Sequence, residues 1–158
     1  MNSDDTSEFL RHIMQYCASA ERCTQDVTHK LVSWNVPEEK WDEILQKLRH
    51  ENFLDDTRYA NSYVTEKWKL DHWGKQKIKH GLLQKGFKEP DIETALNSID
   101  PKDYAASLHL VLSKKRSELN IEDPVILAKR LLSFAKNKGF EDEEIWQWMN
   151  DNGIDLDN

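Results

Sequence analysis

Apolar residues along this chain recur at intervals of three and four positions, the spacing that places side chains on one face of an α-helix. The clearest segments run over residues 9–17, 41–48, 59–64, 92–99 and 104–112. No comparable run alternates with a period of two, so the pattern predicts no half-buried strand. Each of the four prolines stands just before or inside the first turn of a helical segment, where a helix tolerates proline. The sequence therefore predicts an all-α fold.

The helical pattern repeats three times, with offsets of 51 and 53 residues between corresponding positions. Val36, Phe87 and Phe140 align, and the positions nine residues earlier and five, eight and nine residues later are apolar in all three units. The residues just before these anchors are Asn35, Gly86 and Gly139, types that tolerate the left-handed backbone that ends many helices. In each unit the pattern therefore predicts two helices, a left-handed turn and a third helix.

From this alignment we expect three tandem three-helix repeats, at residues 1–54, 55–100 and 101–152, followed by an acidic C-terminal tail at 153–158. Asp55 and Asp56 are expected to cap the first helix of the second repeat, since carboxylates accept hydrogen bonds from the free amides of a helix start. Repeats of this kind contact chiefly their neighbours, so the predicted architecture is an elongated, possibly curved array.

The composition excludes several classes of enzyme. The five glycines never cluster, so the glycine-rich loops that cradle phosphates in common nucleotide-binding enzymes are absent from the sequence. No set of nucleophile, base and oxyanion donors can be named either. We therefore expect no catalytic residues, no enzymatic activity and no cofactor.

The two cysteines, Cys17 and Cys23, are six positions apart on a helical pattern, where they would face different directions and bridge poorly. Together with His29 they match no zinc-ligand spacing, so no metal site is expected. The N-terminus has acidic residues instead of a signal peptide, and no apolar run approaches a membrane span. These features predict a reduced, cytoplasmic protein that does not interact with a membrane.

Charge is unevenly distributed along the chain, although the net charge is only −7. Residues 141–158 contain seven acidic side chains and no Lys or Arg, so residues 1–140 are balanced. Within the balanced part, residues 67–88 contain seven Lys and a single acid, Asp71. This basic band is the candidate surface for an anionic partner. Its candidate contact residues are Lys67, Lys69, Lys75, Lys77 and Lys79.

Two sequence motifs resemble the RecX family of bacterial regulatory proteins, with the best match over residues 24–99. The first is a junction of the pattern apolar-Leu-Asp-Asp-x-Arg-aromatic-Ala, formed here by Phe53, Leu54, Asp55, Asp56, Arg58, Tyr59 and Ala60. The second is Lys-Gly-aromatic after the next helix, formed by Lys85, Gly86 and Phe87. The first repeat departs from the family in having only Arg22 where an Arg-rich stretch is common.

The resemblance implies a regulator that binds the RecA filament on single-stranded DNA and inhibits or modulates its recombinase activity, ATP hydrolysis and filament growth. It implies no catalysis. On this interpretation the partners are the RecA filament and the single-stranded DNA within it, and we expect the chain to be a monomer. An array of helices with one basic band suits a filament groove that exposes both protein and phosphate.

Other interpretations of the same residues stay open. A Lys-rich surface is often only a solvated face, and Trp68 and Trp73 could stack on bases or, as we favour, seal a helix junction. The main rival is a set of helix-turn-helix modules that read duplex DNA. The presumed recognition helices have the wrong charge for that role. Residues 38–49 contain four acids and three Lys or Arg. Residues 89–98 contain three acids, residues 141–151 contain five, and neither segment contains Lys or Arg, so these helices would repel DNA phosphates.

Overall fold

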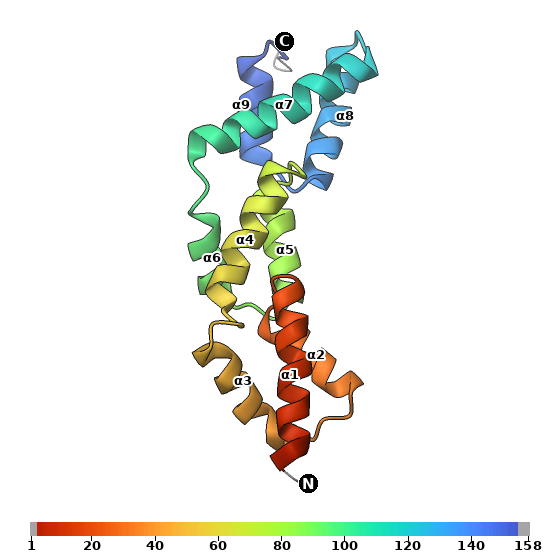
Figure 1. Cartoon of the computed structure of the whole chain (residues 1–158). Coiled ribbons are helices and arrows are strands. Elements are labelled where there is room, and N and C mark those ends of the chain that lie inside the picture. Colours follow the sequence, from red (N-terminus) through yellow and green to blue (C-terminus); the bar gives the residue numbers. More distant parts are fainter. Residues whose placement is uncertain (1–2, 155–158) are drawn as a thin grey trace. The chain divides into compact units, whose positions relative to one another are not determined.

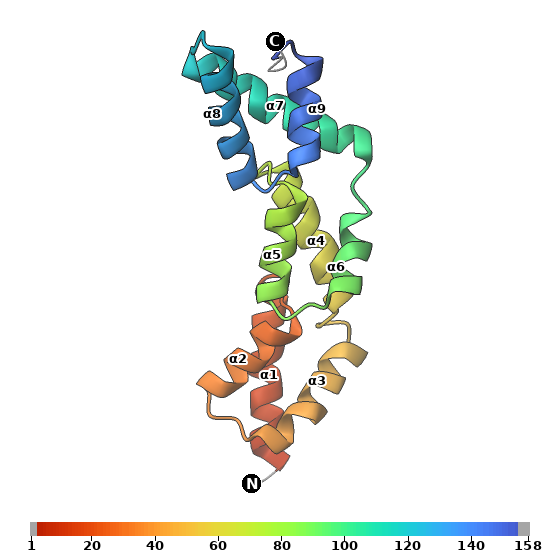
Figure 2. The same cartoon turned by 180° about the vertical axis from the view of Figure 1, so that it is seen from behind.

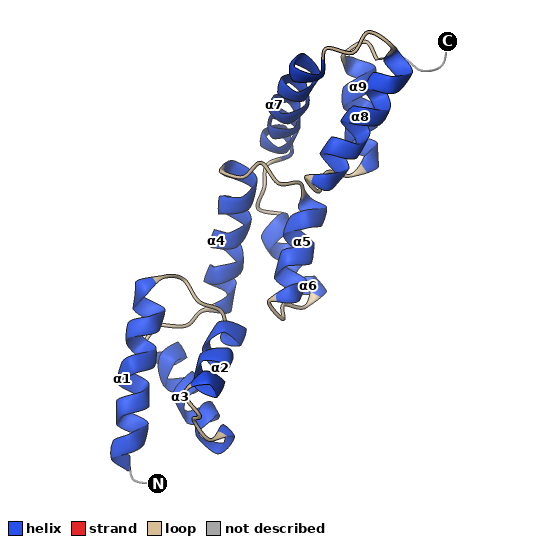
Figure 3. Ribbon diagram, turned by 90° about the vertical axis from the view of Figure 1, so that its right-hand side faces the viewer, coloured by secondary structure: helices blue, strands red, loops and turns tan. Residues whose placement is uncertain are grey.

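The computed structural model describes residues 3–154, and within this range every regular element is a helix (Figure 3). The helices, with a 3₁₀ turn at Glu38–Lys40, are α1 (Ser3–Ser19), α2 (Thr24–Ser33), α3 (Trp41–His50), α4 (Asp56–Lys69), α5 (Lys75–Gln84), α6 (Glu89–Leu96), α7 (Pro101–Leu119), α8 (Pro124–Asn137) and α9 (Asp142–Asp151). The predicted all-α class is confirmed. The last four residues of the predicted acidic tail lie outside the described range.

The chain divides into two compact units, Met1–Ala60 and Asn61–Asn158. The division falls inside α4, so it coincides with none of the predicted repeat boundaries. Those boundaries stay predictions, as does the elongated array. The order of the helices is nonetheless that of three successive triplets, α1 to α3, α4 to α6 and α7 to α9.

The first unit is built around one apolar cluster. Its fully buried members come from all three helices and the following turn: Ile13, Val27, Leu31, Ile44, Leu48 and Leu54. Trp34 and Trp41 are partly buried and pack against this cluster. Each helix thus buries one apolar stripe and exposes a polar face, as an amphipathic helix should.

In the second unit α7 lies across both α8 and α9 on the same side (Figures 1 and 2). The repeat columns found in the sequence are buried here too, since Ile78, Leu131 and Ile145 have no exposed surface. Trp148 is 7 % exposed and is therefore a core residue. Ser107 is the one buried polar residue among the described positions.

The three predicted left-handed turns are confirmed. Asn35, Gly86 and Gly139 have φ angles of +58°, +87° and +101°. In each case the following residue donates its amide to a carbonyl five positions back, with N···O distances of 3.0, 3.1 and 3.0 Å. This is the hydrogen bond of a Schellman cap, which satisfies a carbonyl left free at the helix end. The repeat therefore extends to the backbone geometry between the second and third helices.

The two aspartates at the start of α4 have different roles. Asp55 caps α4 as predicted, because its Oδ1 accepts a 3.0 Å hydrogen bond from the amide of Arg58. The capping role expected for Asp56 is wrong. Its carboxylate instead accepts hydrogen bonds from the amide and the hydroxyl of Thr24, at 2.8 and 2.7 Å. The Asp56 carboxylate therefore pairs with the free backbone amide at the start of α2, a helix that is distant from Asp56 in the sequence.

Candidate nucleic-acid and filament interface

The five candidate lysines lie at the C-terminal end of α4 and along α5, on either side of the loop 70–74. This loop turns the chain between the two helices, with His72 in the left-handed region at a φ of +53°. The local fold therefore brings lysines from two helices together around a single loop. The side chains nevertheless have different surroundings, and they fall into two groups.

The first group surrounds Trp73. The ammonium groups of Lys67 and Lys77 lie 4.7 and 4.4 Å from the centre of its indole ring. Both are attracted by the negative face of the ring, which offsets part of their mutual repulsion. Lys67 also forms a 3.3 Å ion pair with Asp71. Trp73 therefore holds two positive charges together at the surface.

Trp73 itself is half-buried, and its amide donates a 3.0 Å hydrogen bond to the carbonyl of Lys67. These contacts favour the junction-sealing interpretation of this residue. Lys69 is exposed, with its ammonium 5.5 Å from the ring centre of the neighbouring Trp68. We use the name Trp73 cluster for Lys67, Lys69, Trp73 and Lys77.

Lys75 and Lys79 form the second group, and nearby acids balance their charges. Lys79 lies between Glu89 and Glu93 of α6, with N···O distances of 3.5 and 3.7 Å. The ammonium of Lys75 lies 4.8 Å from the ring centre of Tyr104, whose hydroxyl donates a 2.8 Å hydrogen bond to Glu141. The structure therefore places the five candidates in two environments, of which only the Trp73 cluster keeps a net positive charge.

Burial dominates the electrostatics of the Tyr104 contact. It raises the pKa of Tyr104 well above its ordinary value, so this side chain stays a neutral hydrogen-bond donor. Burial also raises the pKa of Glu141, against the hydrogen bond from Tyr104 and the charge of Lys75. The Tyr104 hydroxyl in addition accepts a 2.9 Å hydrogen bond from the amide of Lys75, so it ties α7 to the start of α5. These contacts have a structural role.

One basic residue next to the Trp73 cluster was missed in the sequence. The ammonium of Lys138 donates a 2.8 Å hydrogen bond to the carbonyl of Asp71. Desolvation, followed by repulsion from Lys77, lowers the pKa of Lys138. A signal was available, because Lys138 begins a second Lys-Gly-aromatic triplet, aligned with the one at Lys85.

The cysteines offer no alternative site. Cys17 and Cys23 are both buried and are not joined in a disulfide. Burial raises the pKa of the Cys17 thiol, which disfavours the nucleophilic thiolate. Within residues 3–154, no three His, Cys, Asp or Glu side chains gather in a way that could hold a metal ion. In the same range, no helix is both long enough and apolar enough to cross a membrane.

The fold and the basic surface define an all-α protein of three-helix repeats, with a surface suited to an anionic partner. The model of the family domain described as "RecX, second three-helix domain" matches residues 55–96. The "Regulatory protein RecX" of Clostridium tetani is 27% identical over 139 residues, which are 87% of this chain and 63% of that protein. The protein of that name from Prosthecochloris aestuarii is 25% identical over 151 residues, covering 96% and 97% of the two chains.

The "Regulatory protein RecX" of Limosilactobacillus reuteri (strain DSM 20016) is 34% identical over 116 residues, 73% of this chain and 42% of that protein. The chain thus spans 63% of the length of the Clostridium tetani protein and 42% of the length of the Limosilactobacillus reuteri protein.

Two solved structures agree in fold. A crystal structure of regulatory protein RecX superposes with a TM-score of 0.85 at 27% identity, covering 94% of this chain and 74% of that one. That of RecX from Lactobacillus salivarius superposes with a TM-score of 0.90, covering 98% and 100% of the two chains, and at 23% identity it bears on the fold alone. The chain belongs to the RecX family. The curated relatives that it matches are named regulatory proteins.

Proposed function

We propose that this chain binds the RecA filament on single-stranded DNA and inhibits or modulates its recombinase, ATPase and filament-growth activities. The observation that carries the proposal is the Trp73 cluster, in which Lys67 and Lys77 flank one indole ring. Lys69, at the end of α4, adds a further exposed charge. Positive side chains held at a surface neutralise phosphates and release their counterions, and this release drives binding to nucleic acid.

The candidate contacts are not equal in this proposal. Lys67, Lys69 and Lys77 contribute most, because nearby carboxylates do not cancel their combined charge. Lys79 contributes least, because it lies between Glu89 and Glu93. Lys75 is intermediate, since its ammonium lies over Tyr104 beside the partly buried Glu141. Lys138, although absent from the first set of candidates, extends the basic surface beyond Lys77.

The rival proposal, sequence-specific reading of duplex DNA by the third helices, has weaker support. The exposed surface of the 3₁₀ turn and of α3 includes Glu39, Asp42 and Glu43, and these acids would face DNA phosphates. On α6 the acids Glu89 and Glu93 are also exposed. Helices that enter a groove of DNA carry basic or neutral polar residues there, because the phosphates flank the groove on both sides.

The test compares two triple variants that change the net charge equally. One variant is Lys67→Glu, Lys69→Glu, Lys77→Glu, and the matched control is Lys40→Glu, Lys47→Glu, Lys129→Glu. Binding to a RecA–single-stranded DNA filament formed with ATP is measured by fluorescence anisotropy at several salt concentrations, together with ATP hydrolysis. The first variant should bind at least about tenfold more weakly and with a smaller salt dependence, and the control should bind nearly as the unmodified chain does.

Circular dichroism should show the same helix content for both variants. The proposal fails if the unmodified chain neither binds the filament nor changes its ATP hydrolysis at any ratio. Equal weakening by the two variants would show that the general charge of the chain, rather than the Trp73 cluster, governs binding. A preferred duplex sequence bound without RecA would support the rival proposal instead.

A further inference from the structure

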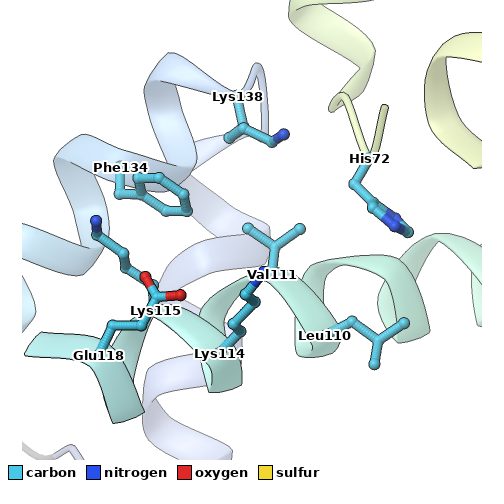
Figure 4. A pocket seen from close by; sticks show the side chains of 8 residues that line it. All are labelled: His72, Leu110, Val111, Lys114, Lys115, Glu118, Phe134 and Lys138. Atoms are coloured by element: carbon cyan, nitrogen blue, oxygen red, sulfur yellow. The ribbon is translucent and has the colours of Figure 1, made fainter. Parts of the chain in front are cut away.

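A groove of about 420 Å³ lies between α7 and α8, next to the loop that contains His72 (Figure 4). Its floor is apolar and comes from both helices. Phe134 on α8 faces Val111 on α7, and both side chains are partly buried. Leu110 lies at the edge of the groove, where 61% of its surface is exposed. A volume of this size is typical of pockets that hold a small ligand or a few side chains of a partner.

The rim of the groove is basic. Lys114 and Lys115 on α7 and Lys138 at the end of α8 line it, with Glu118 as the single acid. The ammonium of Lys115 lies 4.6 Å from the ring centre of Phe134. Among the described residues, none of the three lysines forms an ion pair. The rim therefore has a net positive charge that no ion pair among the described residues neutralises.

We propose that this groove binds a short acidic peptide segment of a partner protein, anchored by one aromatic or branched aliphatic side chain. The anchor lies between Val111 and Phe134, and the flanking carboxylates of the peptide pair with Lys114, Lys115 and Lys138. Apolar burial supplies affinity for the anchor, at a site where Leu110 is otherwise exposed to water. Charge complementarity with the rim selects acidic neighbours on either side of the anchor.

The geometry favours a peptide over single-stranded nucleic acid as the occupant. Binding of bases requires accessible aromatic faces on which they stack. Here the ammonium of Lys115 lies over the ring of Phe134, and the opposite wall is formed by the aliphatic side chains of Leu110 and Val111. The ring of His72 is held in place by Ser107, at 3.4 Å from its hydroxyl. The groove therefore fits a side chain better than a stacked base.

The groove is a second surface, distinct from the Trp73 cluster, although Lys138 lies beside both. A partner that contacts both surfaces through one chain would gain affinity because the second contact becomes intramolecular. The proposal does not depend on the identity of the filament, since the peptide chemistry follows from the groove alone. It is therefore tested without RecA.

The test uses the full chain and fluorescence polarisation of labelled peptides. The probe is an acidic peptide with one Phe among Asp and Glu residues, and the control peptide has Ala in place of that Phe. We expect saturable binding of the Phe peptide, and at least about tenfold weaker binding of the Ala peptide. Lys114→Glu with Lys115→Glu should also weaken binding about tenfold. The matched pair Lys102→Glu with Lys129→Glu, on the same helices but outside the groove, should not.

Leu110→Ala provides a variant that leaves the core intact, since this side chain is largely exposed. This substitution should weaken binding of the Phe peptide more than binding of the Ala peptide, because it removes part of the apolar contact with the Phe side chain. No saturable binding of the Phe peptide, or equal binding of the two peptides, would overturn the proposal. The proposal would also be overturned if labelled oligo-dT bound the chain, if Lys114→Glu with Lys115→Glu abolished this binding, and if the Phe peptide did not compete with it. The occupant of the groove would then be nucleic acid.

Discussion

Gly74 and Gly139 lie with their backbones in direct contact, although they are far apart in the sequence. The amide of Gly74 donates a 2.7 Å hydrogen bond to the carbonyl of Lys138, and the carbonyl of Gly139 accepts a 2.9 Å hydrogen bond from the amide of Gln76. A Cβ atom at position 74 would overlap the carbonyl carbon of Gly139 and the nitrogen of Phe140. This contact joins the start of α5 to the turn between α8 and α9, and it places Lys138 beside the Trp73 cluster.

Gly74→Ala should therefore destabilise the protein, by about 2 to 3 kcal/mol, because the added methyl group meets backbone atoms that cannot rotate away. The backbone at Gly74 has a φ of −79° and a ψ of 167°, which alanine adopts readily, so the loss would measure the close approach itself. The measurement is the free energy of unfolding in urea. Gln76→Ala is the control, since its side chain is exposed and its amide is retained. A loss no larger than that of the control would contradict the close packing.

Leu82 and Leu83 are neighbours in α5 with opposite environments, which makes them a matched pair. Leu82 has no exposed surface, whereas 42% of Leu83 is exposed. Leu82→Ala should lower the free energy of unfolding by about 2 to 5 kcal/mol, because it removes apolar burial and leaves a cavity. Leu83→Ala should lower the free energy of unfolding by less than about 1 kcal/mol. Similar thermal midpoints for the two variants would show that the core face of α5 is assigned wrongly.

Asp56 should stabilise the first unit through Thr24. Asp56→Ala leaves the amide at the start of α2 without its carboxylate partner, so we expect a loss of about 1 to 2 kcal/mol. Asp56→Asn should recover part of this loss, because the amide oxygen can still accept from Thr24. Thr57→Ala, at an exposed position of the same helix turn, is the control. Chemical denaturation followed by circular dichroism measures all three, and an Asp56→Ala variant as stable as the control would argue against the contact.

The stability of the second unit should depend on pH through Glu141. Burial raises the pKa of Glu141 above its ordinary value of 4.5, so the folded chain binds more protons than the unfolded chain between these two pKa values. The contribution of Glu141 to stability is therefore full below the ordinary value and is lost as the pH rises through the folded-state value. Glu141→Gln removes this dependence while its amide oxygen still accepts from Tyr104.

The thermal midpoint of Glu141→Gln relative to that of the unmodified chain should rise with increasing pH from about 4.5 towards neutrality. Scanning calorimetry in a series of buffers measures this difference. Glu143→Gln, at an exposed position of the same helix, should show no comparable trend. A constant or falling difference for Glu141→Gln would contradict the role of burial.

Local patterns predicted much of the fold. The apolar columns place Ile78 and Leu131 in the core because a helix with one apolar stripe has one stable orientation against its neighbours. Gly86 and Gly139 identify the left-handed turns because few other residues adopt a positive φ without strain. These predictions depend on the residue and its near neighbours in the sequence, so one chain is enough to make them.

The candidate site was predicted less completely. Charge counting found Lys67 and Lys77, but it could not separate them from Lys79, whose acidic partners Glu89 and Glu93 lie on another helix. It also missed Lys138, which lies far from residues 67–79 in the chain. Counting charges along the sequence does not detect these pairings, because electrostatic energy depends on the distance between charges in space.

The sequence by itself determined that the chain is helical, where the left-handed turns fall and which face of each helix is apolar. These are properties of short segments, set by backbone sterics and by the period of the helix. The tertiary structure alone decided that Asp56 bonds to Thr24, that Gly74 lies against Gly139 and that Phe134 faces Val111 across a groove. Such contacts join residues that are remote in sequence, and they form only when the packing of whole helices brings the partners within a few ångströms of each other.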